Sequence, residues 1–202
     1  MLFRSVSQSR YDAVEESKLD DEYSYLTSHS AYCTHLFYVT NTLDYDGTFI
    51  FPSQYIQSDN DEIRLKALEV LTQYNALYEE DKWKAFYLMC YVIDTCSFDH
   101  QAYFYRKPQN ALYILHNGND AVCEGYTSLY VALLRSIGMK AKAVRTDTHA
   151  WAKVWDKETS TYKMVDCLWN DVDISYIHST SYFWKEDGIY NHPLETDDRP
   201  NR

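Results

Sequence analysis

Apolar residues recur at helical spacing downstream of a cysteine in the second half of the chain. The apolar positions, three or four residues apart, are Cys123, Tyr126, Leu129, Tyr130, Leu133, Leu134 and Ile137. Such spacing places one apolar stripe along a helix that packs against a core. Gly138 follows the stripe and is a common type of residue directly after a helix end. The pattern therefore predicts a helix that begins at Cys123 and ends before Gly138.

Three segments rich in strand-forming residues follow this helix. We predict strands over 141–146, 149–155 and 161–167, with a turn at 157–160 between the last two. Strands joined by so short a turn pair in an antiparallel arrangement. A helix followed by an antiparallel sheet on which it can pack predicts a fold of the α+β class.

Two longer helices and one short helix are predicted upstream of this segment. The longer helices cover 61–80 and 82–95, where apolar residues again recur at helical spacing. The short helix begins at Pro108, a residue that suits the first turn, and ends near His116.

The chain of 202 residues is long enough for one domain with a substantial core. Because no repeat or Pro/Gly-rich linker divides it, we predict a single domain over 61–192. Residues 1–60 are predicted to be an N-terminal extension in which strands at 33–40 and 48–56 form a hairpin. Residues 193–202 are predicted to be a loosely attached C-terminal tail.

Charge and hydrophobicity argue against two classes of partner. The formal net charge of −11 would repel nucleic-acid phosphates and anionic membrane surfaces. The longest apolar run, 85–93, is far shorter than the ~20 residues of a membrane span. The first residues also lack the apolar core of a signal peptide. We predict no nucleic-acid partner and no membrane insertion, and the sequence leaves the compartment open.

The five cysteines are an odd number, so at least one thiol is unpaired within the chain. No CxxC pair occurs, and the histidines are not spaced as zinc ligands beside the cysteines. Cys90 and Cys96 would point to different faces of the helix predicted over 82–95. We therefore predict no metal site and no cofactor.

The register of the predicted hairpin brings His149 close to Asp166. If Asp156 faces Thr161 across the turn, Asp166 is the diagonal neighbour of His149 on one face of the hairpin. A slip of one residue would place the two side chains on opposite faces.

Cys123, His149 and Asp166 together predict nucleophilic chemistry. At a helix start, free N–H groups and the positive end of the helix dipole favour a thiolate, which attacks carbonyl carbon. Asp166 would fix the tautomer of His149, whose other ring nitrogen would share a proton with the Cys123 sulfur. Each residue taken alone is more often structural, and it is their combination and order that favour catalysis.

The residues around this triad resemble a known family. The matching positions are Ala121-Val122-Cys123-Glu124-Gly125-Tyr126, Gly138, His149-Ala150-Trp151, Tyr162, Val165-Asp166 and Trp169, with Asn110-Ala111-Leu112 and Asn117-Gly118 upstream and Tyr182-Phe183 downstream. They resemble the transglutaminase-like superfamily, and more closely its bacterial branch, over about residues 80–192. The resemblance implies a papain-like core, in which the helix bearing the nucleophile packs on an antiparallel sheet, with Cys123, His149 and Asp166 as catalytic residues.

Two positions depart from the pattern of the superfamily without removing a member of the triad. Leu168 stands where many relatives have Thr, and Ala152 stands where Asn is common. The second departure could alter the groove that receives the substrate.

The resemblance implies a thioester between Cys123 and an amide group of a protein or peptide substrate. A lysine amine would then give a cross-link, whereas water would give glutamine deamidation or proteolysis. A cysteine peptidase with the same triad is one alternative. A non-catalytic module that binds proteins through its 20 tyrosines is the other. The resemblance also slightly favours an exported or surface-associated location.

Further residues are candidates for contact with the substrate. Trp151 and Trp169 flank the predicted histidine and aspartate and could wall a groove, although core packing is the commoner role of such residues. Gly125 lacks a side chain near the nucleophile, which would let a substrate backbone come close.

An oxyanion hole is also required, and the backbone N–H of Cys123 is the expected first donor. Gln109, Asn117 and Tyr103 are candidates for the second donor, and the sequence does not decide among them.

Overall fold

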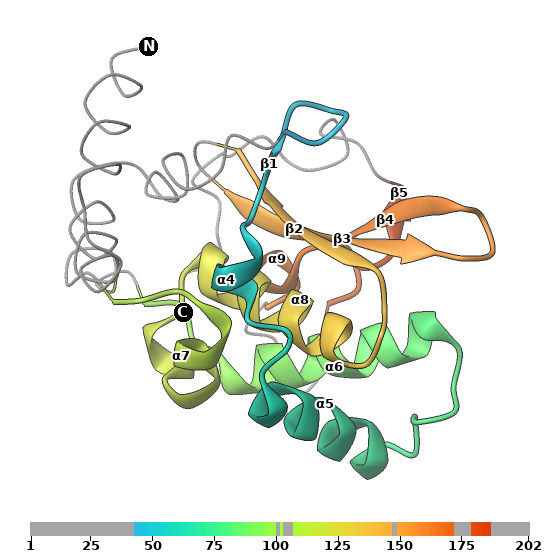
Figure 1. Ribbon diagram of the computed structural model, residues 1–202, viewed down its shortest axis with the longest axis horizontal. Helices are drawn as coiled ribbons and strands as arrows, with labels where there is room; N and C mark the ends of the chain where they lie inside the picture. Colours follow the sequence, from blue (N-terminus) through green and yellow to red (C-terminus); the bar gives the residue numbers. More distant parts are fainter. Residues whose placement is uncertain (1–42, 100–101, 103–106, 147–148, 172–178, 187–202) are drawn as a thin grey trace.

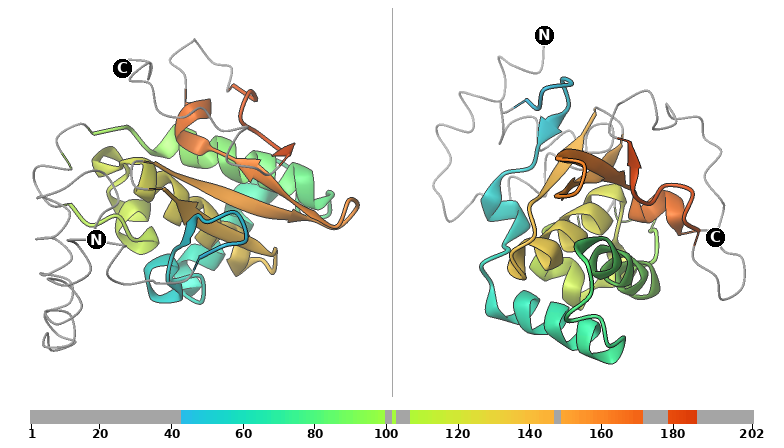
Figure 2. Two further views of the ribbon diagram at one scale, coloured as in Figure 1. Left: turned by 90° about the horizontal axis from the view of Figure 1, so that it is seen from above. Right: turned by 90° about the vertical axis from the view of Figure 1, so that its right-hand side faces the viewer.

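The computed structural model describes residues 43–99, 102, 107–146, 149–171 and 179–186. Its strands form one antiparallel sheet that lies over a layer of helices (Figure 1). The right-hand view of Figure 2 shows the order of the layers: the sheet, then helix α8 (Cys123–Ser136), then helices α5 (Asp61–Gln73) and α6 (Asp81–Thr95). This arrangement confirms the predicted α+β class.

The sheet has five strands in the order β1-β2-β3-β4-β5, all of them antiparallel to their neighbours. The strands are β1 (Phe49–Ile50), β2 (Ala141–Arg145), β3 (Ala150–Asp156), β4 (Thr161–Val165) and β5 (Lys185–Glu186). Strands β3 and β4 pair Asp156 with Thr161 and Trp155 with Tyr162. This is the predicted register.

The hairpin of β3 and β4 ends slightly earlier than the sequence predicts. Strand β4 stops at Val165 because the next residue, Asp166, begins the short helix α9 (Cys167–Asn170). The Asp166 carboxylate accepts a hydrogen bond from the backbone N–H of Trp169, as the capping residue of a helix commonly does. His149 directly precedes β3, so His149 and Asp166 lie beyond the same end of the hairpin.

The helices agree with the predicted ones in position, with two corrections in length. Besides α5, α6, α8 and α9, they are α4 (Ser53–Ile56), α7 (Ala111–His116) and the 3₁₀ turn η2 (Gly118–Asp120). The short helix α7 begins at Ala111 and not at Pro108, because the Asn110 side chain caps it by accepting from the Tyr113 N–H. Helix α5 ends at Gln73, although apolar spacing predicts a helix over 61–80. The cause is Asn75, whose φ of 55° is left-handed and cannot continue a right-handed helix.

Residues 43–60, the described part of the predicted N-terminal extension, pack on the core. Strand β1 pairs with β2, and α4 contacts α8. The segment 48–56 is therefore partly helical and joins the main sheet, whereas its predicted hairpin partner, 33–40, lies outside the described residues. The divisions of the chain at residues 60 and 192 stay predictions.

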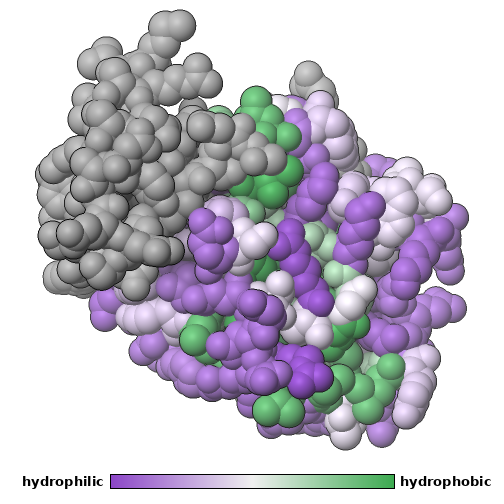
Figure 3. Space-filling model, in the orientation of Figure 1, coloured by the Kyte–Doolittle hydropathy of each residue, from purple (hydrophilic) through white to green (hydrophobic). Residues whose placement is uncertain are grey.

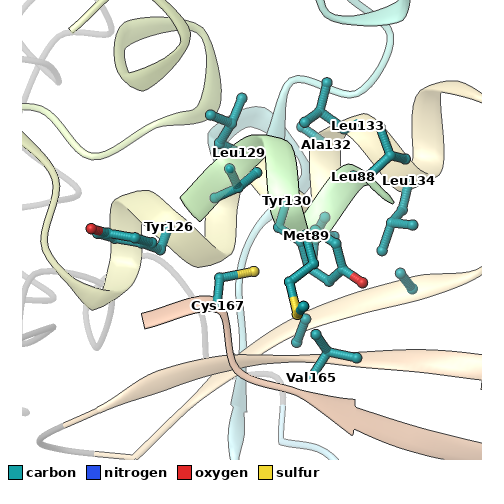
Figure 4. Close-up of a cluster of buried hydrophobic side chains, with 14 of the residues drawn as sticks. Leu88, Met89, Tyr126, Leu129, Tyr130, Ala132, Leu133, Leu134, Val165 and Cys167 are labelled. Carbon is teal, nitrogen blue, oxygen red and sulfur yellow. The ribbon is translucent and has the colours of Figure 1, made fainter. Parts of the chain in front are cut away.

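Helix α8 is the centre of the fold. All its residues from Cys123 to Leu134 are buried, because α5, α6, α7, β2 and β3 all contact it. The sequence predicts a one-sided apolar stripe, whereas the helix is enclosed on every side. Figure 4 shows side chains of α6 and α8 in contact beside Val165 and Cys167. The buried Tyr130 hydroxyl donates a hydrogen bond to the Ala85 carbonyl at 3.0 Å.

The opposite face of the sheet carries a buried cluster of charges. The ammonium group of Lys153 is fully buried and lies 3.0 Å from an Asp44 oxygen and 2.7 Å from an Asp46 oxygen. Lys142 binds the other Asp44 oxygen at 2.7 Å, and the Tyr45 ring lies beside both lysines. These contacts hold the turn before β1 against the sheet.

The described surface in Figure 3 is mainly hydrophilic, with separate hydrophobic patches. Among the helices of the described residues, none has the length and apolar character needed to span a bilayer.

Candidate active site

Cys123 is the first residue of α8, and only 1% of its surface is exposed. The preceding Val122 has an extended backbone and no polar side chain with which to cap the helix. The sulfur therefore lies where the N–H groups of the first turn and the helix dipole favour negative charge.

His149 and Asp166 form a short, buried contact. The Nε2 of His149 lies 2.6 Å from the Asp166 Oδ2, and the two side chains are 3% and 1% exposed. The other Asp166 oxygen accepts from the Trp169 N–H at 2.9 Å, and the Asp166 N–H donates to the Tyr182 carbonyl at 3.0 Å. With both oxygens and the backbone bonded, the carboxylate has a fixed orientation toward the imidazole.

The imidazole of His149 is also hydrogen-bonded to the Cys123 side chain. Burial alone would lower the pKa of the imidazole, because a buried cation loses its hydration. The charge of Asp166 and hydrogen bonds to Asp166 and Cys123 act in the opposite direction and raise the pKa from 6.5 to about 10. The imidazole is therefore held as a cation at neutral pH, next to a thiol.

The other described cysteines lie in a different environment. Cys90, Cys96 and Cys167 are free and buried, and burial raises the pKa of the first two thiols to about 12. Burial and the charge of Asp166 raise the pKa of Cys167 well above its ordinary value. Cys123 likewise forms no disulfide with another described cysteine. It is the one cysteine among the described residues that is hydrogen-bonded to an imidazole.

Two indole rings enclose the imidazole of His149. Trp151 is stacked on it, with ring centroids 6.1 Å apart, and Trp169 meets it edge-on at 5.9 Å. Tyr182 in turn packs against Trp169. Both tryptophans are buried, so in this structure they shield the imidazole from water. Their contact with a substrate stays a prediction.

Gly125 and Gln109 lie beside each other, but their contacts differ from those expected. A Cβ on Gly125 would lie 2.4 Å from the Gln109 Oε1 and 2.9 Å from Ile114, so the space beside the glycine is already filled. The Gln109 amide nitrogen donates to the carbonyls of Asp120 and Lys107. The Gln109 side chain therefore bonds the protein backbone, and Gly125 is covered by the side chains of Gln109 and Ile114. Contact of either residue with a substrate stays a prediction.

The other candidates for a second oxyanion donor are not placed beside Cys123 by any described contact. The Asn117 side chain is exposed and donates to the Tyr113 carbonyl at the end of α7. Tyr103 lies outside the described residues.

Several features of the site have no local signal in the sequence. The Tyr126 hydroxyl donates to the Asp171 carboxylate at 2.6 Å, which ties α8 to the chain after α9. The Asn170 side chain accepts from the Tyr182 N–H and so fixes the segment that holds Asp166. Helix α9 has only four residues, too few for a periodic pattern. Within the described ranges, no group of three His, Cys, Asp or Glu residues could hold a metal ion.

Comparison with known proteins identifies a family for the chain. A family model, described as the transglutaminase-like superfamily, matches residues 69–174, slightly more than half of the chain. The match runs from the middle of α5 past α9 and contains Cys123, His149 and Asp166. A search of curated proteins finds no match.

Proposed function

Because the chain belongs to the transglutaminase-like superfamily, we propose that it is a cysteine-dependent acyl-transfer enzyme that acts on amide groups of proteins or peptides. The observation that carries this proposal is the buried His149–Asp166 contact of 2.6 Å, with the thiol of Cys123 as the other partner of the imidazole. A thiol, an imidazole and an orienting carboxylate are the parts that nucleophilic acyl transfer needs.

The first half of the proposed reaction forms a thioester. The Cys123 thiolate attacks the carbonyl carbon of a glutamine side chain, and the backbone N–H of Cys123 stabilises the oxyanion. The imidazolium of His149 gives its proton to the leaving nitrogen, the C–N bond breaks and ammonia departs. Asp166 keeps the ring oriented throughout.

The second half transfers the acyl group. A primary amine attacks the thioester to give a cross-link, or water attacks it to give glutamate. His149, now neutral, accepts the proton of the attacking group. The buried indoles of Trp151 and Trp169 limit the access of water to the imidazole, which favours the amine.

Incubation with dimethylated casein and a fluorescent amine tests the proposal. We expect the amine to be incorporated at casein glutamines by the natural protein and not by Cys123→Ala. The matched control is Cys90→Ala, which removes a buried thiol outside the site and should retain the activity.

Mass spectrometry of the casein distinguishes the alternatives. Glutamines converted to glutamate in a Cys123-dependent way would support the same thioester with water as the acceptor. New N-termini would instead indicate a cysteine peptidase. The non-catalytic module would be supported if casein shows no covalent change and Cys123→Ala binds casein as well as the natural protein does.

A further inference from the structure

We propose that Gln109 is a positioning residue that fixes the backbone around Cys123, so that the Cys123 N–H points at the forming oxyanion. This role rests on the proposed acyl-transfer function. Gln109 lies in the loop that leads into α7, and 3% of its surface is exposed. Its side chain contacts the chain both before and after Cys123.

The first set of contacts lies just before the nucleophile. The Gln109 Oε1 accepts from the Val122 N–H at 2.8 Å, and its Nε2 donates to the Asp120 carbonyl at 2.8 Å. The same Nε2 donates to the Lys107 carbonyl at 3.3 Å. One carboxamide therefore binds two of the three residues that precede Cys123.

The second set of contacts lies just after the nucleophile. The Gln109 Oε1 would be 2.4 Å from a Cβ on Gly125, so only a glycine leaves room for the carboxamide in its present position. The Ser128 hydroxyl donates to the Gln109 carbonyl at 2.5 Å. Gln109 is thus packed against the first two turns of α8 as well as bonded to the loop before it.

The loop before Cys123 is also anchored from outside. The Asp120 carboxylate accepts from the Tyr113 hydroxyl at 2.7 Å and lies 3.3 Å from the Lys107 ammonium group. The Asp99 N–H donates to the Ala121 carbonyl at 2.9 Å. With these anchors in place, the bond from the Val122 N–H to Gln109 fixes the Ala121–Val122 peptide. This peptide directly precedes the Val122–Cys123 peptide, whose carbonyl accepts from the Tyr126 N–H at 3.1 Å and whose N–H is the proposed oxyanion donor.

Positioning of this peptide affects one reaction of the sulfur and not another. An oxyanion donor must lie at hydrogen-bond distance from the forming oxyanion, and a misplacement of 1 Å can cost about 100-fold in rate. The sulfur is instead hydrogen-bonded to the imidazole of His149, whereas the hydrogen bonds of the Gln109 carboxamide go to Val122, Asp120 and Lys107. Loss of Gln109 should therefore slow acylation of Cys123 and leave its alkylation unchanged.

The test compares these two reactions in Gln109→Met, which keeps the length of the side chain and removes its hydrogen bonds. With p-nitrophenyl acetate, the sulfur bonds to the acetyl carbon, the ester C–O bond breaks and p-nitrophenolate leaves through an oxyanion intermediate. With iodoacetamide, the sulfur displaces iodide from saturated carbon and no oxyanion forms. We expect acylation to fall about tenfold or more, and alkylation of the Cys123 peptide to change by less than about twofold.

Amide hydrogen exchange adds a readout at the proposed contact itself. We expect the Val122 N–H to exchange faster in Gln109→Met, since it loses its acceptor. The matched control is Gln57→Met, which removes a similar bond from the Gln57 side chain to the Leu112 N–H at the start of α7. The control should leave both reactions of Cys123 as they are.

Three results would overturn the role of Gln109. Slower acylation with unchanged Val122 exchange would mean that Gln109 itself donates to the substrate. A parallel fall in acylation and alkylation would mean a merely structural role, and unchanged acylation would mean no role. If Gln109→Met does not fold, Gly125→Ala displaces the same carboxamide and should give the same selective loss of acylation.

Failure of the proposed function would give a different pattern. The ester and the iodoacetamide report on Cys123 without an amide substrate. If the natural protein leaves casein unchanged, the proposed function is contradicted. If Gln109→Met still loses acylation selectively, Gln109 remains a positioning residue.

Discussion

At the scale of single residues, the decisive feature is a histidine whose charge is set by its neighbours. Asp166 has both oxygens bonded and cannot turn away from His149, so its negative charge acts on the imidazole at a fixed distance. This raises the pKa of His149 to about 10 in spite of burial. The ring is then a cation over the whole physiological range and can pair with a thiolate.

The pH dependence of the reaction follows from this shift. His149 must be protonated to release the leaving nitrogen, so amine incorporation should fall as the pH rises through about 10. In Asp166→Asn the largest favourable charge is lost, so the pKa of His149 should fall and the alkaline loss of activity should move to lower pH. Casein labelling measures the alkaline loss of activity, and an NMR titration of the His149 ring measures its pKa, each over a range of roughly pH 7–11.

The variant Asp166→Asn keeps an oxygen for the Trp169 N–H, so helix α9 should persist. An alkaline limb and a ring titration that do not move in this variant would contradict control of His149 by Asp166.

At the scale of elements, the sequence predicts what local patterns encode. The apolar spacing after Cys123 places α8 correctly, and the short turn at 157–160 places β3, β4 and their register. The end of α5 is wrong in the prediction, because a left-handed Asn75 interrupts a pattern that otherwise continues to residue 80. A single backbone angle leaves no trace in apolar periodicity.

Elements defined by distant partners are also missed. Strand β1 has two residues and exists because β2 offers its edge, about 95 positions further along the chain. The bond network of Gln109 is likewise absent from the prediction, which assigns this residue to the substrate, because its partners are backbone groups that any sequence would supply. The absence of a side chain at Gly125 is interpreted from the sequence as room for a substrate backbone, whereas in the structure the Gln109 side chain fills that space.

The end of α8 allows a prediction about a single element. Gly138 has a φ of +83°, and a Cβ there would meet no other atom. Gly138→Ala should therefore destabilise the protein by backbone strain alone, about 1–2 kcal/mol, as measured by urea unfolding, and leave casein labelling intact.

Gly47→Ala is the matched control, since Gly47 has a φ of +86° and equally open space but lies in the turn before β1. Similar costs in the two variants would support strain as the cause. A clearly larger cost at Gly138 would show that its neighbours also matter.

At the scale of the whole molecule, the two faces of the sheet are held in different ways. One face packs on α8 through apolar side chains, whereas the other binds the turn at residues 44–48 through buried charges. Asp44 bonds two lysines, Lys142 and Lys153, and Lys153 has no exposed surface. Removal of that carboxylate would leave a buried ammonium group with one fewer partner.

Because Lys153 keeps its contact with Asp46, we expect Asp44→Asn to destabilise the protein by about 1.5–3 kcal/mol. The control is Asp61→Asn, which breaks an exposed ion pair with Arg64 and should cost less than about 1 kcal/mol. Urea unfolding of both variants gives the comparison. Equal and small costs would show that the buried cluster does not hold the turn.

The burial of α8 has a consequence for how the protein fails when it is heated. The sulfur belongs to the most enclosed helix, whose opening requires the surrounding helices and strands to separate first. Thermal inactivation should then coincide with melting of the entire domain, with no long-lived species that is folded but inert. Protein that regains its native structure on cooling should recover its catalytic competence in the same step.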